Sequence, residues 1–168
     1  MPDIVTMGKP MGNGFPVAGA AMRPELVKEF GEKGRYFNTF GGNPVAAAAG
    51  MAVLDVIEGE GLQDHALKMG AVLKEGLENI AAKHPVIGDV RGTGLFWAVE
   101  CVTSRETNQP DAACASFVVN HLRNNGVLIS ATGPGANILK IRPPLVLQEE
   151  EAQFFVDAVA AAFAAAPQ

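Results

Sequence analysis

Residues 4–16 read IVTMGKPMGNGFP, and the class of the fold follows from this stretch. Its first four residues, Ile4 to Met7, form a short apolar run that predicts a buried strand. Glycine, proline and asparagine are frequent from Gly8 to Pro16, which predicts a loop. A lysine directly after the carboxyl end of a strand, here Lys9, lies in the crevice where open α/β folds bind ligands. In an α/β fold of this open kind, the stretch therefore places a candidate ligand site at Lys9.

The residues that follow this loop continue the same kind of structure. Their pattern predicts a short strand at 17–22, a short helix at 24–30, a loop at 31–43 and a helix at 44–58. The start of the last helix is well marked, because Asn43 can cap it and Pro44 suits its first position. Nearly every residue of this helix is apolar on every face, so we expect it to be buried all round.

The second half of the chain combines one-sided helices with strands. Apolar residues recur at helical spacing over residues 62–83 with lysines and glutamates between them, which predicts an amphipathic helix that covers a sheet. The strands that we expect lie at 86–90, 95–99, 127–131 and 138–142, and the helices at 111–124 and 148–164. Three glutamates open the last helix, where its dipole favours negative charge.

This change of pattern divides the chain into two expected domains. Residues 1–59 are predicted to be the edge of a larger domain, and residues 60–168 a small α+β domain. The first strand begins directly after Met1-Pro2-Asp3, whereas a domain normally starts with a few dispensable residues. We therefore expect the chain to be a piece of a longer protein.

Composition excludes several classes of function. Of the 168 residues, 48% are hydrophobic and 18% charged, the net charge is −5, and no basic run could follow a nucleic-acid backbone. No stretch approaches the roughly 18 apolar residues of a membrane span, and no signal peptide is recognisable. Two cysteines, Cys101 and Cys114, form no disulfide framework, and the three histidines have no metal-ligand spacing. A cytoplasmic location without nucleic-acid, membrane or metal partners is the expectation.

Lys9 is the first candidate for chemistry. Gly8, Gly12 and Gly14 would let the backbone approach a ligand closely, and a lysine amine can serve as a nucleophile. The motif is neither a Walker A loop nor GxGxxG, because no Ser or Thr follows the lysine and two of the glycines come after it. The other interpretation is a surface lysine in a glycine-rich turn.

Residues 38–44, which read NTFGGNP, form the second candidate. A hydroxyl followed by two glycines and a helix N-terminus is a suitable anion site, since free backbone N–H groups and the positive end of the helix dipole point the same way. Thr39 could donate to a phosphate oxygen there. The competing interpretation is a simple helix cap with a flexible lead-in.

Together these motifs resemble the class III aminotransferases, which depend on pyridoxal phosphate (PLP). The first segment resembles the Schiff-base lysine segment of the family, and the second its phosphate loop. Two further motifs resemble the start of the small domain and the end of the C-terminal strand. The four motifs occupy residues 2–16, 38–44, 91–96 and 142–145 in the family's order and span essentially the whole chain.

The resemblance implies a fragment of a fold type I PLP enzyme, made of the edge of the large-domain sheet and the complete small α+β domain. Lys9 would hold PLP as a Schiff base and move a proton between the substrate Cα and the cofactor. Thr39, Phe40 and Gly41 would bind the cofactor, with Thr39 at the PLP phosphate of the other subunit of a homodimer. Arg142 would bind a substrate carboxylate or form an inner salt bridge.

The resemblance also implies parts that this chain does not contain. The aspartate at the pyridine nitrogen, a further phosphate loop and an aromatic residue on the ring lie N-terminal to the lysine in the family, so we expect the chain alone to be inactive. Among PLP enzymes, the sequence of residues 7–14 is similar both to that of alanine–glyoxylate-type aminotransferases and to that of phospholyases, which act on phosphorylated amino alcohols. A non-catalytic, truncated association module is the remaining alternative.

Overall fold

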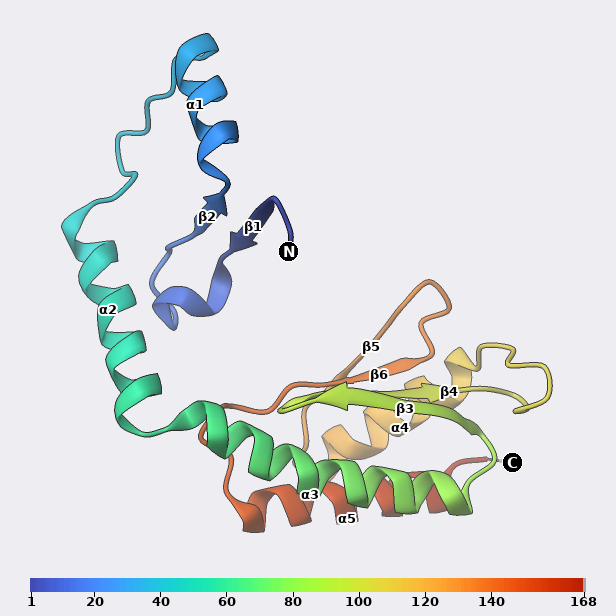
Figure 1. The fold of residues 1–168 in the computed structure, drawn as a ribbon. Coiled ribbons are helices and arrows are strands. Elements are labelled where there is room, and N and C mark those ends of the chain that lie inside the picture. Colours follow the sequence, from blue (N-terminus) through green and yellow to red (C-terminus); the bar gives the residue numbers. More distant parts are fainter. Residues whose placement is uncertain (168) are drawn as a thin grey trace. The chain divides into compact units, whose positions relative to one another are not determined.

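The computed structural model describes residues 1–167 as two compact units (Figure 1). The N-terminal unit comprises Met1–Gly61, and the C-terminal unit begins at Leu62. No helix among the described residues is long and apolar enough to cross a membrane.

The N-terminal unit starts with a two-stranded antiparallel sheet. Strand β1 (Ile4–Met7) pairs with β2 (Gly19–Met22), and the single-turn helix η1 (Lys9–Gly12) lies in the connection between them. The prediction of a strand at residues 4–7 is confirmed, and the second strand is shorter than predicted at its N-terminal end. The loop between the strands folds back closely on itself at Gly12. A Cβ atom there would lie 2.7 Å from Val17 Cγ1.

Two helices complete this unit, α1 (Pro24–Lys33) and α2 (Pro44–Gly59). The predicted cap of α2 is confirmed: the Asn43 side chain accepts a hydrogen bond from the Ala46 amide at 2.9 Å, with Pro44 at the first position. Helix α2 contacts η1 but buries only Ala46, so the expectation of burial on all faces is wrong for these 168 residues. Its apolar side chains have too few neighbours within the unit to be covered.

The C-terminal unit contains a four-stranded antiparallel sheet in the order β3-β4-β6-β5. The strands are β3 (Ile87–Thr93), β4 (Phe96–Cys101), β5 (Ser130–Thr132) and β6 (Ile138–Ile141). Strands β3 and β4 form a hairpin with Thr93 opposite Phe96, and β6 pairs with β4 so that Lys140 lies opposite Ala98. All four strands were predicted, although the fifth strand of the chain begins three residues later than expected.

Three helices cover one face of this sheet (Figure 1). Helix α3 (Leu62–Lys83) has the predicted bounds and packs on β3 and against α5 (Glu149–Ala165), while α4 (Ala112–Asn124) contacts β4, β5 and β6. The core between them includes Leu73, Leu77, Val118 and Leu139, each of which is at most 1% exposed. The prediction that the 62–83 helix covers a sheet is confirmed.

The opposite face of the sheet carries no helix within the unit. Alternation along the strands places Asp89, Arg91, Glu100 and Lys140 on this open face, whereas Trp97 and its inward-facing neighbours are buried. Arg91 lies inside β3, opposite Ala98 of β4. The hairpin turn lies at residues 94 and 95, after the end of β3. Gly92 packs closely against β4, since a Cβ atom there would lie 2.3 Å from the Phe96 carbonyl oxygen.

Candidate active site

Lys9 follows β1 at the first position of η1 and is exposed. Its backbone has φ 47°, a left-handed conformation that non-glycine residues seldom adopt. Within residues 1–167 its amine makes neither an ion pair nor a hydrogen bond. The side chain borders a shallow hollow with five residues of the loop, Gly14, Phe15, Pro16, Val17 and Ala18. Among the described residues the amine therefore has no partner and lies beside this hollow.

The backbone around Lys9 is wound tightly by hydrogen bonds between neighbours. Met11 N–H donates to the Gly8 carbonyl at 3.4 Å, Asn13 N–H to Pro10 at 3.1 Å and Phe15 N–H to Gly12 at 3.0 Å. Asn13 and Gly14 also have positive φ values, 43° and 107°. This succession of local bonds fixes the position of the loop relative to the end of β1, and with it the base of the Lys9 side chain.

Thr39 lies at the tip of a turn that the Asn38 side chain organises. Asn38 Oδ1 accepts hydrogen bonds from the amides of Phe40 and Gly41, at 3.1 and 3.0 Å. Gly41 suits this turn, since a Cβ atom there would lie 3.1 Å from Asn38 Cβ and Cγ. Thr39 is exposed, and its amide and that of Gly42 have no acceptor within residues 1–167. Thr39 can therefore donate to an anion, whereas the amides of Phe40 and Gly41 are already engaged.

The other end of this segment is held by Asn43. Its side-chain nitrogen donates to the Phe40 carbonyl at 2.9 Å, and its backbone amide donates to the same oxygen at 3.3 Å. Because Asn43 also caps α2, the turn that carries Thr39 is attached to the N-terminus of that helix. The phenyl ring of Phe40 itself is 78% exposed, so it is available to contact a partner or a ligand.

Arg142 directly follows β6 in the C-terminal unit and is exposed. Within the described chain it forms no ion pair, so the structure does not assign it a salt-bridge role. Two residues earlier, Lys140 lies half-buried in the middle of the open face, between Ala98 and Ser130. The sequence interpretation singled out Arg142 and passed over Lys140, although strand alternation could have placed both cations on one side.

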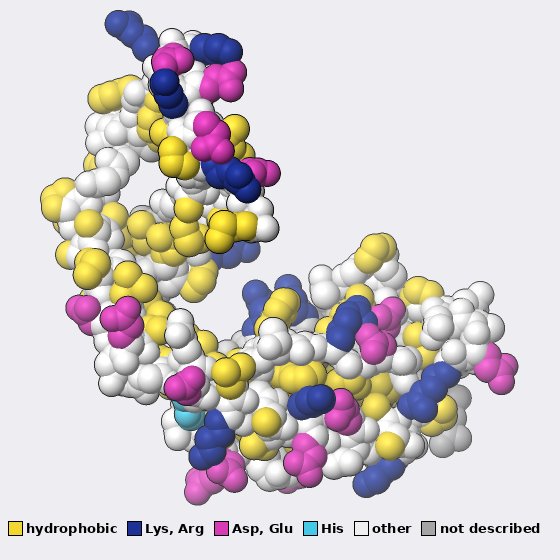
Figure 2. Space-filling model, in the orientation of Figure 1, with side chains coloured by type: hydrophobic (Ala, Val, Ile, Leu, Met, Phe, Trp, Pro, Cys, Tyr) yellow, Lys and Arg dark blue, Asp and Glu magenta, His cyan; other side chains and the backbone are white. Residues whose placement is uncertain are grey.

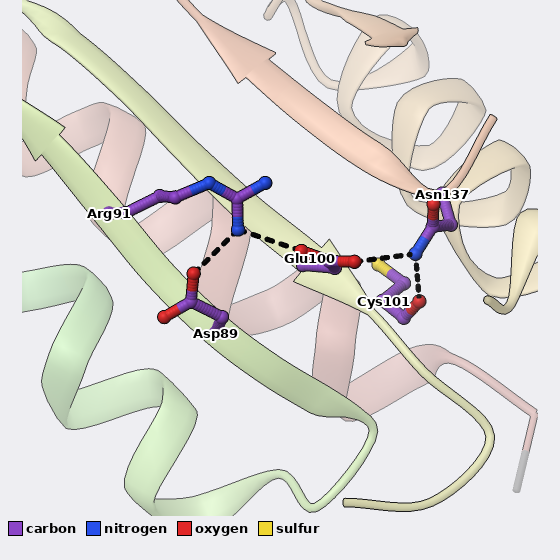
Figure 3. Close-up of polar contacts among 5 residues, drawn as sticks. All are labelled: Asp89, Arg91, Glu100, Cys101 and Asn137. Carbon is purple, nitrogen blue, oxygen red and sulfur yellow. Dashed lines mark hydrogen bonds and ion pairs between the residues drawn. The ribbon is translucent and has the colours of Figure 1, made fainter. Parts of the chain in front are cut away.

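The same face carries a network of polar contacts (Figure 3). Arg91 Nη1 donates to Asp89 Oδ2 at 2.5 Å and to Glu100 Oε2 at 2.7 Å, and these hydrogen bonds raise the pKa of the guanidinium. Asn137 Nδ2 lies 3.5 Å from Glu100 Oε1 and donates to the Cys101 carbonyl at 2.8 Å. Arg91 thus has a structural role, through one ion pair within β3 and one across to β4.

The predicted site residues fall into separate groups. Lys9 and the segment 38–43 belong to the N-terminal unit, where no hydrogen bond joins them in the described chain, and Arg142 belongs to the C-terminal unit. Asn38 is the residue that the sequence interpretation missed. An asparagine two and three residues before a Phe-Gly pair is a signal for this kind of turn, because its side chain can accept hydrogen bonds from nearby amides.

Comparison with known proteins supports a family assignment. The family described as "Aminotransferase class-III" matches residues 1–163. Ethanolamine-phosphate phospho-lyase homolog 1 of Caenorhabditis elegans is 49% identical over 89% of this chain and 32% of its own length. Alanine–glyoxylate aminotransferase 2 homolog 2, mitochondrial, of Arabidopsis thaliana is 44% identical over 95% of this chain and 33% of its own.

Two solved structures show the same fold. A phospholyase from Arthrobacter in complex with phosphoethanolamine has a TM-score of 0.94 and 42% identity, over 99% of this chain and 40% of that one. A PLP-bound amine transaminase from an uncultivated Pseudomonas species has a TM-score of 0.86 and 34% identity, over 99% and 39% of the two chains.

The chain belongs to the class III aminotransferase family, whose members are PLP-dependent enzymes of fold type I. It spans about a third of the length of the curated relatives that it matches.

The residues of this chain fit part of a PLP site. The free Lys9 amine suits a cofactor aldehyde, and Thr39 in its fixed turn suits a phosphate oxygen. The hollow beside Lys9 is bordered by no carboxylate, so these residues offer no partner for the protonated pyridine nitrogen. The fit therefore covers the covalent link and one phosphate contact.

Proposed function

We propose that this chain supplies the cofactor lysine and the small C-terminal domain of a PLP-dependent enzyme that transfers an amino group. The donor would be an amino acid or an amine, and the acceptor an oxo acid or an aldehyde. Family membership and the relatives named as aminotransferases support this proposal. Division into the end of a large domain, residues 1–59, and a small domain, residues 60–168, accords with the two compact units.

The observation that carries the proposal is the state of Lys9. Its amine is exposed and unpaired among the described residues, and its left-handed backbone holds the side chain at the end of a strand. A non-glycine residue in this conformation costs about 1–3 kcal/mol and persists where the surrounding structure imposes it, often at functional sites. The exposed amine at the end of β1, together with this strained backbone, therefore supports the proposal.

Lys9 Nζ would hold the cofactor and then move the proton at the substrate Cα. A bound PLP supplies an electron sink that makes this proton removable. Proton transfer needs the lysine amine within hydrogen-bonding distance of the reacting group. The local hydrogen bonds of residues 8–15 fix the backbone from which the Lys9 side chain extends. These residues would thereby keep Nζ within reach of the reacting carbon.

Thr39 would donate its hydroxyl to the cofactor phosphate, with the Phe40 ring and Gly41 completing this part of the site. In our proposal the cofactor belongs to the other subunit of a homodimer, which agrees with the exposure of Thr39 and Phe40. Arg142 would bind a substrate carboxylate through its guanidinium fork. Its exposure and its lack of an ion pair within residues 1–167 support this role.

The test is reductive trapping in the longest natural polypeptide that contains these residues. Borohydride treatment with PLP should label one peptide, and trypsin makes the assignment simple because cleavage does not occur between Lys9 and Pro10. Cleavage does not occur between Arg23 and Pro24 either, so the tryptic peptide ends at Lys28 and carries Lys9 as its only internal lysine within residues 1–28. A label that fragment ions place on any other lysine would remove the central assignment.

A phospho-lyase is the second candidate, and a specific observation favours it. The Caenorhabditis elegans relative and the Arthrobacter structure, both phospholyases by name, are 49% and 42% identical to this chain. The substrate would then be a phosphorylated amino alcohol, and phosphate would be eliminated. Release of inorganic phosphate without a 2-oxo acid acceptor would support the lyase, whereas strict dependence on the acceptor would support the aminotransferase.

We also propose a cytoplasmic location, on the ground that the two cysteines form no disulfide framework. The Arabidopsis thaliana relative is named mitochondrial, so the organelle is the competing location. Fractionation of cells that express the full-length protein distinguishes them.

A further inference from the structure

Two buried cysteines take no part in the proposed chemistry. Cys101 ends β4 and Cys114 lies in the first turn of α4, and both belong to the core of the C-terminal unit. The two thiols are free, and each shifts the pKa of the other, as neighbouring side chains do. Thirteen positions apart in sequence, they meet because the segment between β4 and α4 folds back on itself.

One aspartate connects the backbones of the two cysteines. The Asp111 amide donates to the Cys101 carbonyl at 3.0 Å, and Asp111 Oδ1 accepts from the Cys114 amide at 2.8 Å. Asn137 fixes Cys101 further: its carbonyl accepts from the Cys101 amide and its side chain donates to the Cys101 carbonyl, both at 2.8 Å. Figure 3 shows the hydrogen bond from the Asn137 side chain to the Cys101 carbonyl. Both cysteines are therefore held at the same junction of sheet and helix.

The two thiols differ in their surroundings. The neighbouring Cys101 side chain lowers the pKa of Cys114, and the N-terminal position of Cys114 in α4 acts in the same direction. The pKa of Cys101 is raised by the Cys114 side chain, by burial and by the charges of Asp111 and Glu100. Cys114 keeps 7% of its surface exposed and Cys101 none, so a small reagent meets Cys114 first.

We propose that Cys101 and Cys114 form an oxidation site, at which a hydroperoxide converts the two thiols into a reversible intrachain disulfide. The site is independent of Lys9 and of the proposed amino transfer. Its ligand class is a small peroxide, since the exposed fraction of Cys114 leaves little room for a bulky oxidant.

The reaction balances in two steps. The Cys114 thiolate attacks the OH oxygen of the peroxide, the O–O bond breaks, hydroxide leaves from hydrogen peroxide or an alkoxide from an organic hydroperoxide, and a sulfenic acid forms on Cys114. The Cys101 thiol loses its proton and attacks the Cys114 sulfur, so that the S–S bond forms and the S–O bond breaks, with release of a second hydroxide. For hydrogen peroxide, two thiols are oxidised by two electrons, and the peroxide is reduced to two waters.

Tryptic mapping of the wild-type chain tests the proposal directly. Cleavage after Arg91, Arg105 and Arg123 places Cys101 on the peptide of residues 92–105 and Cys114 on that of residues 106–123. After treatment with hydrogen peroxide and alkylation in denaturant, we expect these peptides as one cross-linked species, lighter by two hydrogens than their sum. A thiol reductant should restore both alkylation sites.

Two variants assign the steps. Cys101→Ser should leave a sulfenic acid on Cys114 that a dimedone-type reagent traps, and Cys114→Ser should leave Cys101 unmodified at the same peroxide dose. Circular dichroism checks that both variants fold, and the wild-type mapping does not depend on either of them. Independent over-oxidation of the two cysteines, a disulfide between chains, or equal modification of Cys101 in Cys114→Ser would overturn the proposal.

Discussion

At the scale of single residues, the backbone of Lys9 is the feature with the clearest energetic cost. Its φ of 47° places the Cβ atom in an unfavourable position that a glycine would not experience. A residue before proline favours extended backbone, so Pro10 does not produce this conformation, and the local hydrogen bonds of residues 8–15 are what hold it. A strained residue whose amine is exposed beside a hollow is a candidate functional residue.

Replacement of Lys9 should therefore separate stability from activity. In the longest natural polypeptide, Lys9→Gly and Lys9→Ala should both lower turnover by about 10²-fold or more, because the amine is lost. Lys9→Gly should unfold at the higher temperature of the two, by the equivalent of about 1 kcal/mol, since only glycine relieves the strain. Thermal unfolding and an amino-transfer assay measure both effects. Lys28→Ala, at an exposed lysine of α1, is the control and should change neither.

Asn38 determines the form of the turn that presents Thr39. Asn38→Ala removes the acceptor for the amides of Phe40 and Gly41, and we expect PLP affinity to fall about tenfold, the equivalent of roughly 1.4 kcal/mol. The affinity for pyridoxal, which lacks the phosphate, should be unchanged. Asn38→Asp keeps the acceptor and adds a charge, so it should retain the turn but repel the phosphate. Equal losses for both ligands in Asn38→Ala would argue against a role at the phosphate.

The identities of these residues were predictable to different degrees. Lys9 and Thr39 stand in recognisable motifs, and Asn43-Pro44 is a local cap that needs no tertiary information. The motif did not predict which amides of the turn are free to bind a ligand. Asn38 Oδ1 already accepts hydrogen bonds from the amides of Phe40 and Gly41. Side-chain hydrogen bonds of this kind depend on rotamers that a motif does not specify.

At the scale of elements, Arg105 joins the C-terminus of α3 to the loop after β4. Its guanidinium donates to the carbonyls of Ala81, His84 and Ile87, with Nε 2.9 Å from the Ile87 oxygen. A cation at this end of a helix is favoured by the dipole, and Arg105 adds a second donor to the Ala81 and His84 carbonyls, which already accept from the His84 and Ile87 amides. The loop is held against α3 by this one side chain.

We expect Arg105→Ala to destabilise the C-terminal unit by about 1–2 kcal/mol, a value reduced by its partial exposure. The single tryptophan, Trp97, is buried in this unit, so its fluorescence during urea unfolding reports the change. Arg123→Ala, at an exposed arginine in the last turn of α4, is the matched control and should cost only a few tenths of a kcal/mol. Equal midpoints for the two variants would contradict the role of Arg105.

Helix α3 approaches the sheet most closely at Gly70. A Cβ atom there would lie 2.2 Å from the carbonyl oxygen of Gly94, which also accepts a hydrogen bond from Trp97 Nε1 at 2.7 Å. We expect Gly70→Ala to cost about 2–3 kcal/mol, even after the gain in helix propensity, because backbone must move. Gly76→Ala on the same helix meets the Val156 side chain instead, which can rotate, so its cost should be smaller. The same fluorescence measurement ranks them, and the reverse order would refute the explanation.

The elements themselves were largely predictable, and their burial was not. The bounds of α3 follow from its apolar spacing, and Gly61 ends the preceding turn with φ 61°. Helix α2 has an apolar pattern that indicates burial, yet Met51, Leu54 and Val56 are about half exposed. The apolar pattern of a helix shows which side chains it would bury, but not whether the residues that cover them belong to the same 168-residue chain.

At the scale of the whole chain, the two units differ in what they bury. The C-terminal unit has a core of helices packed on a sheet, whereas the N-terminal unit buries only Gly12 and Ala46. Large apolar side chains of the N-terminal unit, including Phe30, Phe37, Phe40 and Val45, are more than half exposed, and Figure 2 shows many of the apolar groups on its surface. Exposed apolar surface on this scale marks a binding interface or promotes association.

We therefore expect the isolated 168-residue chain to self-associate at micromolar concentration and to show no amino transfer. Light scattering after size exclusion should give a mass well above 17.5 kDa, while residues 62–168, which have their own core, should remain monomeric. Val27→Lys on α1 should reduce the association, because it places a charge among the exposed apolar side chains. A monomeric chain at these concentrations would show that the apolar surface of the N-terminal unit is covered in solution by the chain itself. An active monomer would contradict both the proposed dimer site and the need for residues beyond these 168.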